Sequence, residues 1–91
     1  MHPRSEIKKL TDIPNTGKII AEKMKLLDIR EPLDLAGKDP YILYDELCRI
    51  KNKKIDPCLL DVFISAVRFM EGGPPKKWWE FTAERKKSYS Q

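Results

Sequence analysis

Residues 10–29 read LTDIPNTGKIIAEKMKLLDI and organise the rest of the chain. Pro14 fixes its own φ, has no amide hydrogen to donate and disfavours the helical conformation at the residue before it, so a first helix should end there. Asn15 is the non-glycine residue that best tolerates the left-handed conformation, and Gly17 adopts that conformation freely. A second helix should begin at about Lys18. These residues therefore predict a short helix, a very tight hairpin and a second helix.

The second helix has one apolar face and one open end. Its apolar residues recur at helical spacing at Ile20, Ala21, Met24 and Leu27. The first amide hydrogens of a helix lack intrahelical partners, and the helix dipole places partial positive charge behind them. Such an end suits a phosphate. The candidate phosphate-binding residues are therefore Asn15, Thr16, Gly17 and Lys18, with Lys23 following on an exposed turn.

The hairpin resembles the helix-hairpin-helix motif of non-sequence-specific DNA-binding proteins. In that motif an apolar residue precedes Pro-Gly-Ile-Gly, three further residues and Ala, and here residues 13–17 (IPNTG) run on to Ala21 in the same register. Asn15 replaces the first Gly. Thr16 replaces the apolar residue that plugs the hairpin into the core, which implies a looser hairpin. The Pro-Asn-x-Gly variant is similar to that of the C-terminal domain of TfoX-type competence regulators.

The resemblance covers nearly the whole chain. A small bacterial family of pathogenicity-locus or mitomycin-resistance-like proteins has similar segments in the same order: LAGKDP (35–40), LC (47–48), DPCLLDVF (56–63) and WW (78–79). That family consists of helix-hairpin-helix domains. The resemblance implies an all-α fold of about five short helices in a tandem helix-hairpin-helix, SAM-like arrangement. It also implies non-sequence-specific DNA binding, with a link to DNA damage tolerance, repair or competence.

Two later helices have clear start signals. Asp-Pro occurs at 39–40 and at 56–57, and each pair combines an N-cap acid with a proline in the first turn. They predict helices over about 40–50 and 57–71. The pair reads as a second, degenerate hairpin copy whose turn lacks glycine. Asp56 would place a negative charge where the first copy accepts a phosphate, so we expect no phosphate binding of that kind there.

The composition indicates one small domain. The chain has 91 residues, of which 41% are hydrophobic and 35% charged, as in a charge-rich helical domain of modest stability. We expect this domain to span residues 1–75, with frayed residues 1–4 and a cap at Ser5. An aromatic, basic tail over 76–91 should pack on it and end in disorder. No apolar run approaches a bilayer-spanning length, no signal-peptide core is present and there are two cysteines, so we expect a cytoplasmic monomer without membrane contact.

Charge alternates along the chain, with a net charge of +4. Residues 1–30 carry seven Lys/Arg against four Asp/Glu, residues 31–48 carry one against five, and residues 49–54 carry four basic residues and no acid. If the two basic blocks meet on one face, they form a polyanion-binding surface; if they scatter, they are ordinary solvated surface. The lysines of such a surface are Lys8, Lys9, Lys23, Lys25, Lys51, Lys53 and Lys54.

The tail aromatics and the cysteines each admit two interpretations. Trp78 and Trp79, which follow two lysines, stack on unpaired bases or fold back to plug the gap between the helix pairs. Cys48 and Cys58 are buried small hydrophobes or an oxidisable pair. Cys58 lies near a helix N-terminus and is the one reactive candidate.

The sequence holds no catalytic or metal-binding signature. There is no Walker loop and no nucleophile elbow, and the single His2 with two cysteines cannot supply four zinc ligands. Acids such as Asp45, Glu46 and Asp61 are spaced like surface and cap residues. We therefore expect no enzyme activity, no cofactor and no metal. The competing hypothesis is a protein-interaction adaptor that uses the tryptophans and the acidic block over 31–46.

Overall fold

The computed structural model describes residues 7–73 and 77–88. Its four α-helices are α1 (Lys18–Leu26), α2 (Pro40–Lys51), α3 (Pro57–Met70) and α4 (Thr82–Ser88). Its three 3-10 helices are η1 (Leu10–Asp12), η2 (Pro32–Leu35) and η3 (Trp78–Phe81). Those two ranges contain no strand, so the all-α prediction is confirmed. The predicted cap at Ser5, the frayed start and the disordered end after Ser88 fall outside them.

The number of α-helices differs from the expected five. The segment before the hairpin forms the single turn η1 within the described residues, and the segment at Pro32 forms η2. In each turn the side chain of the last acidic residue, Asp12 or Asp34, accepts a hydrogen bond from the backbone amide three residues earlier in the sequence. This hydrogen bond favours a short 3-10 turn over a regular α-helix. The starts of α2 and α3 lie where the Asp-Pro pairs predicted them.

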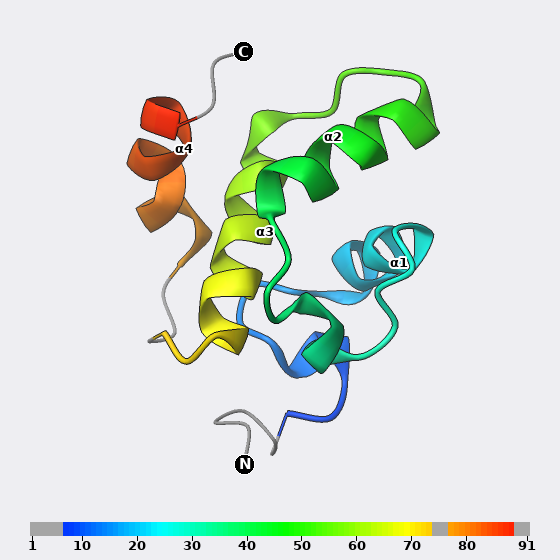
Figure 1. Ribbon diagram of the computed structural model, residues 1–91, viewed down its shortest axis with the longest axis vertical. Helices are drawn as coiled ribbons and strands as arrows, with labels where there is room; N and C mark the ends of the chain where they lie inside the picture. The colour runs from blue at the N-terminus through cyan, green and yellow to red at the C-terminus, as the bar shows by residue number, and fades with distance from the viewer. Residues whose placement is uncertain (1–6, 74–76, 89–91) are drawn as a thin grey trace.

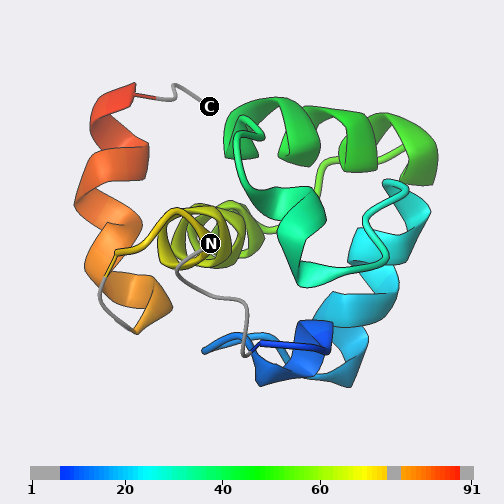
Figure 2. The same ribbon diagram turned by 60° about the horizontal axis from the view of Figure 1, so that its bottom comes forward.

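Helix α3 forms the centre of the fold, and Figure 2 shows it nearly end-on with α2 on one side and α4 on the other. Eleven of its fourteen residues are buried, and Arg68 is its one exposed residue. A helix that is apolar on all sides must be surrounded by other elements. The turn η1, η2 and α1 complete the fold around it (Figure 1).

The turn over residues 13–17 has the arrangement of a type II turn. Thr16 N donates to Ile13 O at 3.1 Å, and Asn15 at the third position has a φ of 68°. The left-handed prediction is therefore confirmed for Asn15, whose Nδ2 also donates to Ser65 Oγ of α3 at 3.0 Å. The prediction is wrong for Gly17, which has a φ of −87° and a ψ of −174°. Asn15 supplies the left-handed residue that reverses the chain direction, so Gly17 does not need to be left-handed. Gly17 is the N-cap of α1, and an N-cap residue has an extended backbone.

Two successive segments, residues 8–26 and 30–51, follow the same local path. Each begins with a 3-10 turn whose last acid accepts hydrogen bonds from the amides three and four residues before it, at 3.1 to 3.3 Å. The two acids are Asp12 and Asp34, 22 positions apart. These carboxylates fix the entry into each turn in the same way.

Both segments then pass through a left-handed residue and enter a helix. The left-handed residues are Asn15, with a φ of 68°, and Gly37, with a φ of 81°. The N-caps of the helices, Gly17 and Asp39, each follow two residues later. The repeated unit is thus a 3-10 turn, a tight turn and a helix, whereas the sequence had suggested the pair α2 and α3 as the second copy.

The C-terminal helix is attached to α3 through a buried carboxylate. Asp61 is fully buried, so its assignment as a surface or cap acid is wrong. It accepts hydrogen bonds from Thr82 Oγ1 at 2.7 Å and from Arg85 Nε at 2.9 Å. The local spacing of acids could not reveal this role, because both partners come from the distant α4.

The two tryptophans do not plug the core. Trp79 is 56% exposed and Trp78 is half-buried, and their rings meet edge to face with centroids 5.5 Å apart. Phe81 packs against the core in their place. Residues three apart in a 3-10 helix share a face, so Phe81 and Trp78 lie together while Trp79 lies on another side.

Candidate nucleic-acid interface

The start of α1 has no capping side chain and no acid in its first turn. In contrast, Asp39 caps α2 by accepting from Tyr41 N at 2.9 Å, and Asp56 caps α3 by accepting from Cys58 N at 2.9 Å. Each of those two helix starts already holds a carboxylate. The first amides of α1, behind the exposed Gly17, are therefore the ones open to an external anion.

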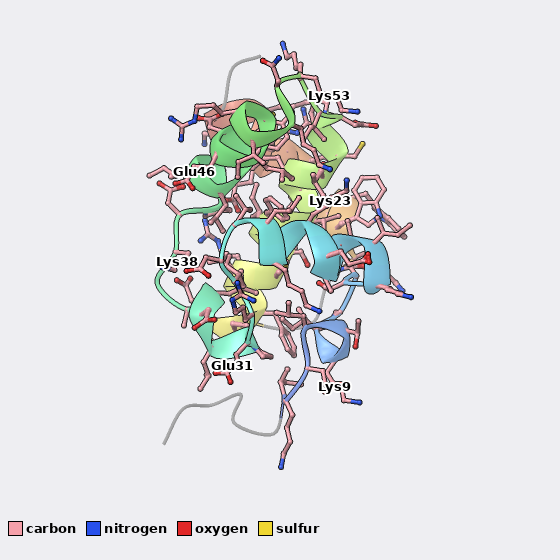
Figure 3. All side chains as sticks on the ribbon, turned by 90° about the vertical axis from the view of Figure 1, so that its right-hand side faces the viewer. Lys9, Lys23, Glu31, Lys38, Glu46 and Lys53 are labelled. Atoms are coloured by element: carbon pink, nitrogen blue, oxygen red, sulfur yellow. The ribbon has the colours of Figure 1, made fainter. Side chains whose placement is uncertain are left out.

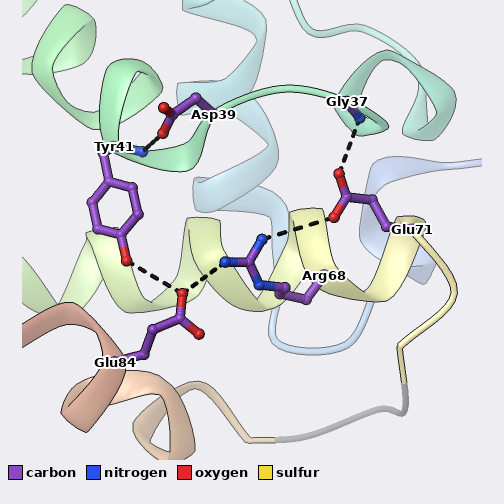
Figure 4. Close-up of polar contacts among 6 residues, drawn as sticks. All are labelled: Gly37, Asp39, Tyr41, Arg68, Glu71 and Glu84. Atoms are coloured by element: carbon purple, nitrogen blue, oxygen red, sulfur yellow. Dashed lines mark hydrogen bonds and ion pairs between the residues drawn. The ribbon is translucent and has the colours of Figure 1, made fainter. Parts of the chain in front are cut away.

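The second segment closes its turn with two carboxylates, as Figure 4 shows. Besides the Asp39 cap, Gly37 N donates at 3.3 Å to Oε2 of Glu71, the residue that follows α3. Arg68 lies 3.8 Å from Glu71 and 2.8 Å from Glu84 of α4, which also accepts from Tyr41 at 3.2 Å. An external phosphate at this turn would meet negative charge that the chain itself supplies.

Thr16 does not suit the role predicted for it. Its amide is engaged by Ile13 O, its side chain is 4% exposed, and no described group lies within hydrogen-bond distance of its Oγ1. The residue fills the plug position that the sequence suggested would be loose. Asn15 uses its side-chain amide on Ser65, so it positions the turn.

The remaining amide donors are those of Gly17, Lys18, Ile19 and Ile20. They precede the first intrahelical bond of the i to i−4 type, which Ala21 N makes to Gly17 O at 2.9 Å. Ile19 and Ile20 were missed in the sequence analysis, although counting amides from the N-cap would have included them. Lys18 is exposed at the first position of the helix and adds a point charge beside these donors.

The predicted lysines lie at three places. Lys23 is half-buried in the last turn of α1, away from the open start, and Lys51 is exposed at the end of α2. In Figure 3 three labelled lysines follow one another from top to bottom on one half of the view: Lys53, Lys23 and Lys9. The other half carries Glu46, Lys38 and Glu31. This arrangement favours basic blocks that share a face over scattered charges.

Lys53 and Lys54 line an open hollow of about 460 Å³ at the end of α2. Arg49 lines the same hollow and was not singled out from the sequence, although it belongs to the same basic block. Asp45 is the acid among the lining residues. Three basic residues and one acid therefore line this hollow, which lies at the Lys53 end of the row of lysines in Figure 3.

The thiol of Cys58 is not activated. Burial, together with the hydrogen bond and the charge of Asp56, raises the pKa of the Cys58 thiol above its ordinary value. The amide of Cys58 in turn lowers the pKa of the Asp56 carboxyl. Cys48 and Cys58 are free and half-buried. Burial and the neighbouring Asp56 carboxylate thus disfavour the thiolate of Cys58, although the residue lies near a helix start.

The part of the chain that the structure describes shows neither a metal-binding cluster nor a membrane-spanning helix. It contains no group of three His, Cys, Asp or Glu side chains that could hold a metal ion. Within the same ranges, no helix has the length and apolar character needed to cross a membrane.

These features define a small all-helical protein in which, among α1, α2 and α3, the start of α1 lacks a capping side chain and lies beside the exposed Lys18. The chain belongs to the Cdd1 family, described as Pathogenicity locus, whose family model matches residues 3–87. It is also 38% identical over 78 residues to "Mitomycin resistance protein McrB" of Streptomyces lavendulae, a match that covers 86% of this chain and 74% of that protein. No solved structure matches the chain significantly. Membership of the pathogenicity-locus and mitomycin-resistance-like family, which the sequence predicted, is confirmed.

Proposed function

We propose that this protein is a non-enzymatic nucleic-acid-binding module that holds the phosphate backbone of DNA at the start of α1. The observation that carries the proposal is the contrast between two equivalent turns. The second turn is occupied by Asp39 and Glu71, whereas the first has a glycine N-cap and no acid in its helix's first turn. Lys18 stands beside the amides there and supplies the positive charge that a phosphate requires.

The helix-hairpin-helix resemblance supports the same function. The IPNTG turn is similar to the hairpins of DNA-binding proteins and of TfoX-type competence regulators, and the repeated path of residues 8–26 and 30–51 is consistent with a tandem arrangement. The McrB relative is named for mitomycin resistance, and the family resemblance implies a link to DNA damage tolerance. We propose that a backbone grip serves that role in the cell.

Binding to the phosphate backbone of DNA has two measurable properties. It reads no bases, so affinity should vary little with sequence. It releases counterions, so affinity should fall steeply with salt. If Lys18, Lys23, Lys53 and Lys54 each neutralise one phosphate, the logarithm of the affinity should fall with the logarithm of salt concentration with a slope of about −3.6.

The sharpest test places an acid at the open helix start. Gly17 has an extended backbone with open space around its Cβ position, so other residues fit there. A Gly17→Asp variant should fold at least as well as the natural chain, because Asp is a favoured N-cap. It should bind labelled duplex DNA at least tenfold more weakly, because its carboxylate occupies the amides. Gly17→Ser is the matched control, since it caps without charge.

Two results would overturn the proposal. One is a natural chain that shows no salt-sensitive binding to duplex or single-stranded DNA. The other is a folded Gly17→Asp variant that binds as tightly as Gly17→Ser. Circular dichroism of both variants establishes that the helix content is intact.

A protein-interaction adaptor is the second candidate function. The exposed ring of Trp79 favours it, because large exposed aromatics are frequent at protein interfaces. This hypothesis predicts that Trp79→Ala abolishes capture of a partner protein and leaves any DNA affinity unchanged. Loss of DNA affinity in Trp79→Ala would instead assign the ring to base stacking.

A further inference from the structure

A second basic hollow lies between η1 and α1, the two elements that the turn over 13–17 joins. Its volume is about 300 Å³. Four basic side chains line it, over a floor of two buried residues: Lys8, Lys9, Lys25 and Arg30 above Leu10 and Ala21. No carboxylate is among its lining residues. We propose that this η1–α1 cleft is a second phosphate-binding site.

The charge of the cleft is not cancelled by its neighbours. The Asp12 carboxylate lies nearby, but its Oδ2 accepts from the backbone amides of Lys8 and Lys9. Asp28 Oδ1 lies 3.3 Å from Arg30 Nε, and both side chains are largely exposed, so this pair is worth little in water. All four basic side chains are exposed and surround an apolar floor, an arrangement that attracts anions.

The position of the cleft indicates that its phosphate belongs to the strand held at the α1 start. Lys18 and Lys25 are seven residues apart, which is two turns, so they share a face of α1 about 10 Å apart along its axis. Phosphates of one duplex strand advance about 3.4 Å each along the DNA axis. Because the strand also winds around that axis, neighbouring phosphates lie farther apart in space than this rise. Two sites about 10 Å apart would therefore hold phosphates one or two apart on the strand. This assignment of the strand rests on the proposed function, whereas the anion site itself does not.

The second segment does not repeat the basic lining of this cleft. The positions that correspond to Lys9 and Lys25, 22 residues on, hold Glu31 and the fully buried Leu47. Ala21 corresponds to Leu43, which is also buried. Larger apolar residues fill that place and an acid replaces a lysine. The basic cleft is therefore a property of the first segment, the same segment that has the uncapped helix start.

A double variant removes half of the cleft's charge without touching the turn. Lys25→Gln with Arg30→Gln should make the slope of log affinity against log salt less negative by about 1.8, because two phosphate contacts are lost. DNA affinity at low salt should fall at least tenfold. The control, Lys86→Gln with Lys87→Gln, changes the charge equally on α4, on the opposite side of α3 (Figure 2), and should leave the slope unchanged.

A second measurement separates this proposal from the proposed function. Titration of the natural chain with tripolyphosphate, followed by amide chemical shifts, should give saturable shifts at Thr11 and Ala21 that the double variant loses. If DNA binds and Gly17→Asp abolishes binding while the double variant keeps the natural slope, the cleft proposal is overturned and the grip at α1 stands. If the natural chain binds no DNA, the proposed function falls. The tripolyphosphate shifts then decide the cleft, and their absence overturns it.

Discussion

Replacing Arg85 with methionine tests how the C-terminal helix is held to the fold. Asp61 is fully buried, and the Arg85 side chain, 12% exposed, lies 2.9 Å from its Oδ1. Methionine keeps much of the aliphatic volume and removes the charge. The Asp61 carboxylate would then retain the hydroxyl of Thr82 as its partner, and losing one member of a buried ion pair costs about 3–5 kcal/mol. Total stabilities for a chain of this length are on the order of 5–14 kcal/mol.

Undocking of α4 sets an upper limit to this cost. If α4 leaves α3, water reaches Asp61 and the buried charge is relieved. The free energy lost then equals the docking energy of η3 and α4, which a chain truncated after Gly73 measures. Adding Asp61→Asn to Arg85→Met removes the unpaired charge, so this double variant should be more stable than Arg85→Met alone.

Urea unfolding followed by two signals checks the reasoning. Both tryptophans lie in η3, so their emission reports the C-terminal region, whereas far-ultraviolet circular dichroism reports all helices. We expect Arg85→Met to lower the midpoint, with the emission change preceding the dichroism change. Lys86→Met, an exposed neighbour, should have little effect. A loss below about 1 kcal/mol, the range of exposed pairs, would refute the argument, as would a failure of Asp61→Asn to restore stability.

Three further outcomes are expected. Thr16→Val should raise the free energy of unfolding by about 1 kcal/mol, because it removes a buried hydroxyl without a described partner; an unchanged or lower value in urea titration would contradict this. The raised pKa of Cys58 keeps its thiol protonated near neutral pH, so its alkylation should be slower in the folded than in the unfolded protein. Alkylation should be faster in the folded Asp56→Asn variant than in the folded natural chain. Equal rates in a mass-spectrometric time course would contradict this assignment. Glu22 lies on the α1 face between Lys18 and Lys25, so Glu22→Gln should tighten DNA binding two- to tenfold in an anisotropy titration, and weaker binding would count against this orientation of the strand.

The boundaries of the helices followed from local rules. Asp-Pro pairs predicted the starts of α2 and α3 because an acid N-cap and a fixed proline φ act within one turn. Asn15 was identified as left-handed for the same kind of reason, since few residues tolerate a positive φ. The candidate site was placed at the start of α1 because amide counting needs no knowledge of distant residues. Family membership followed from the order of short motifs.

Burial and pairing depended on contacts that no local rule contains. Asp61 is spaced like a surface acid, yet Arg85, 24 residues away, makes it the buried anchor of α4. Asn15 binds Ser65, 50 residues away, which fixes the turn on α3. Steric limits on φ and ψ act between neighbours and can be read along the chain. The burial of a side chain depends on which remote segments pack over it, and that is settled when the helices assemble around α3.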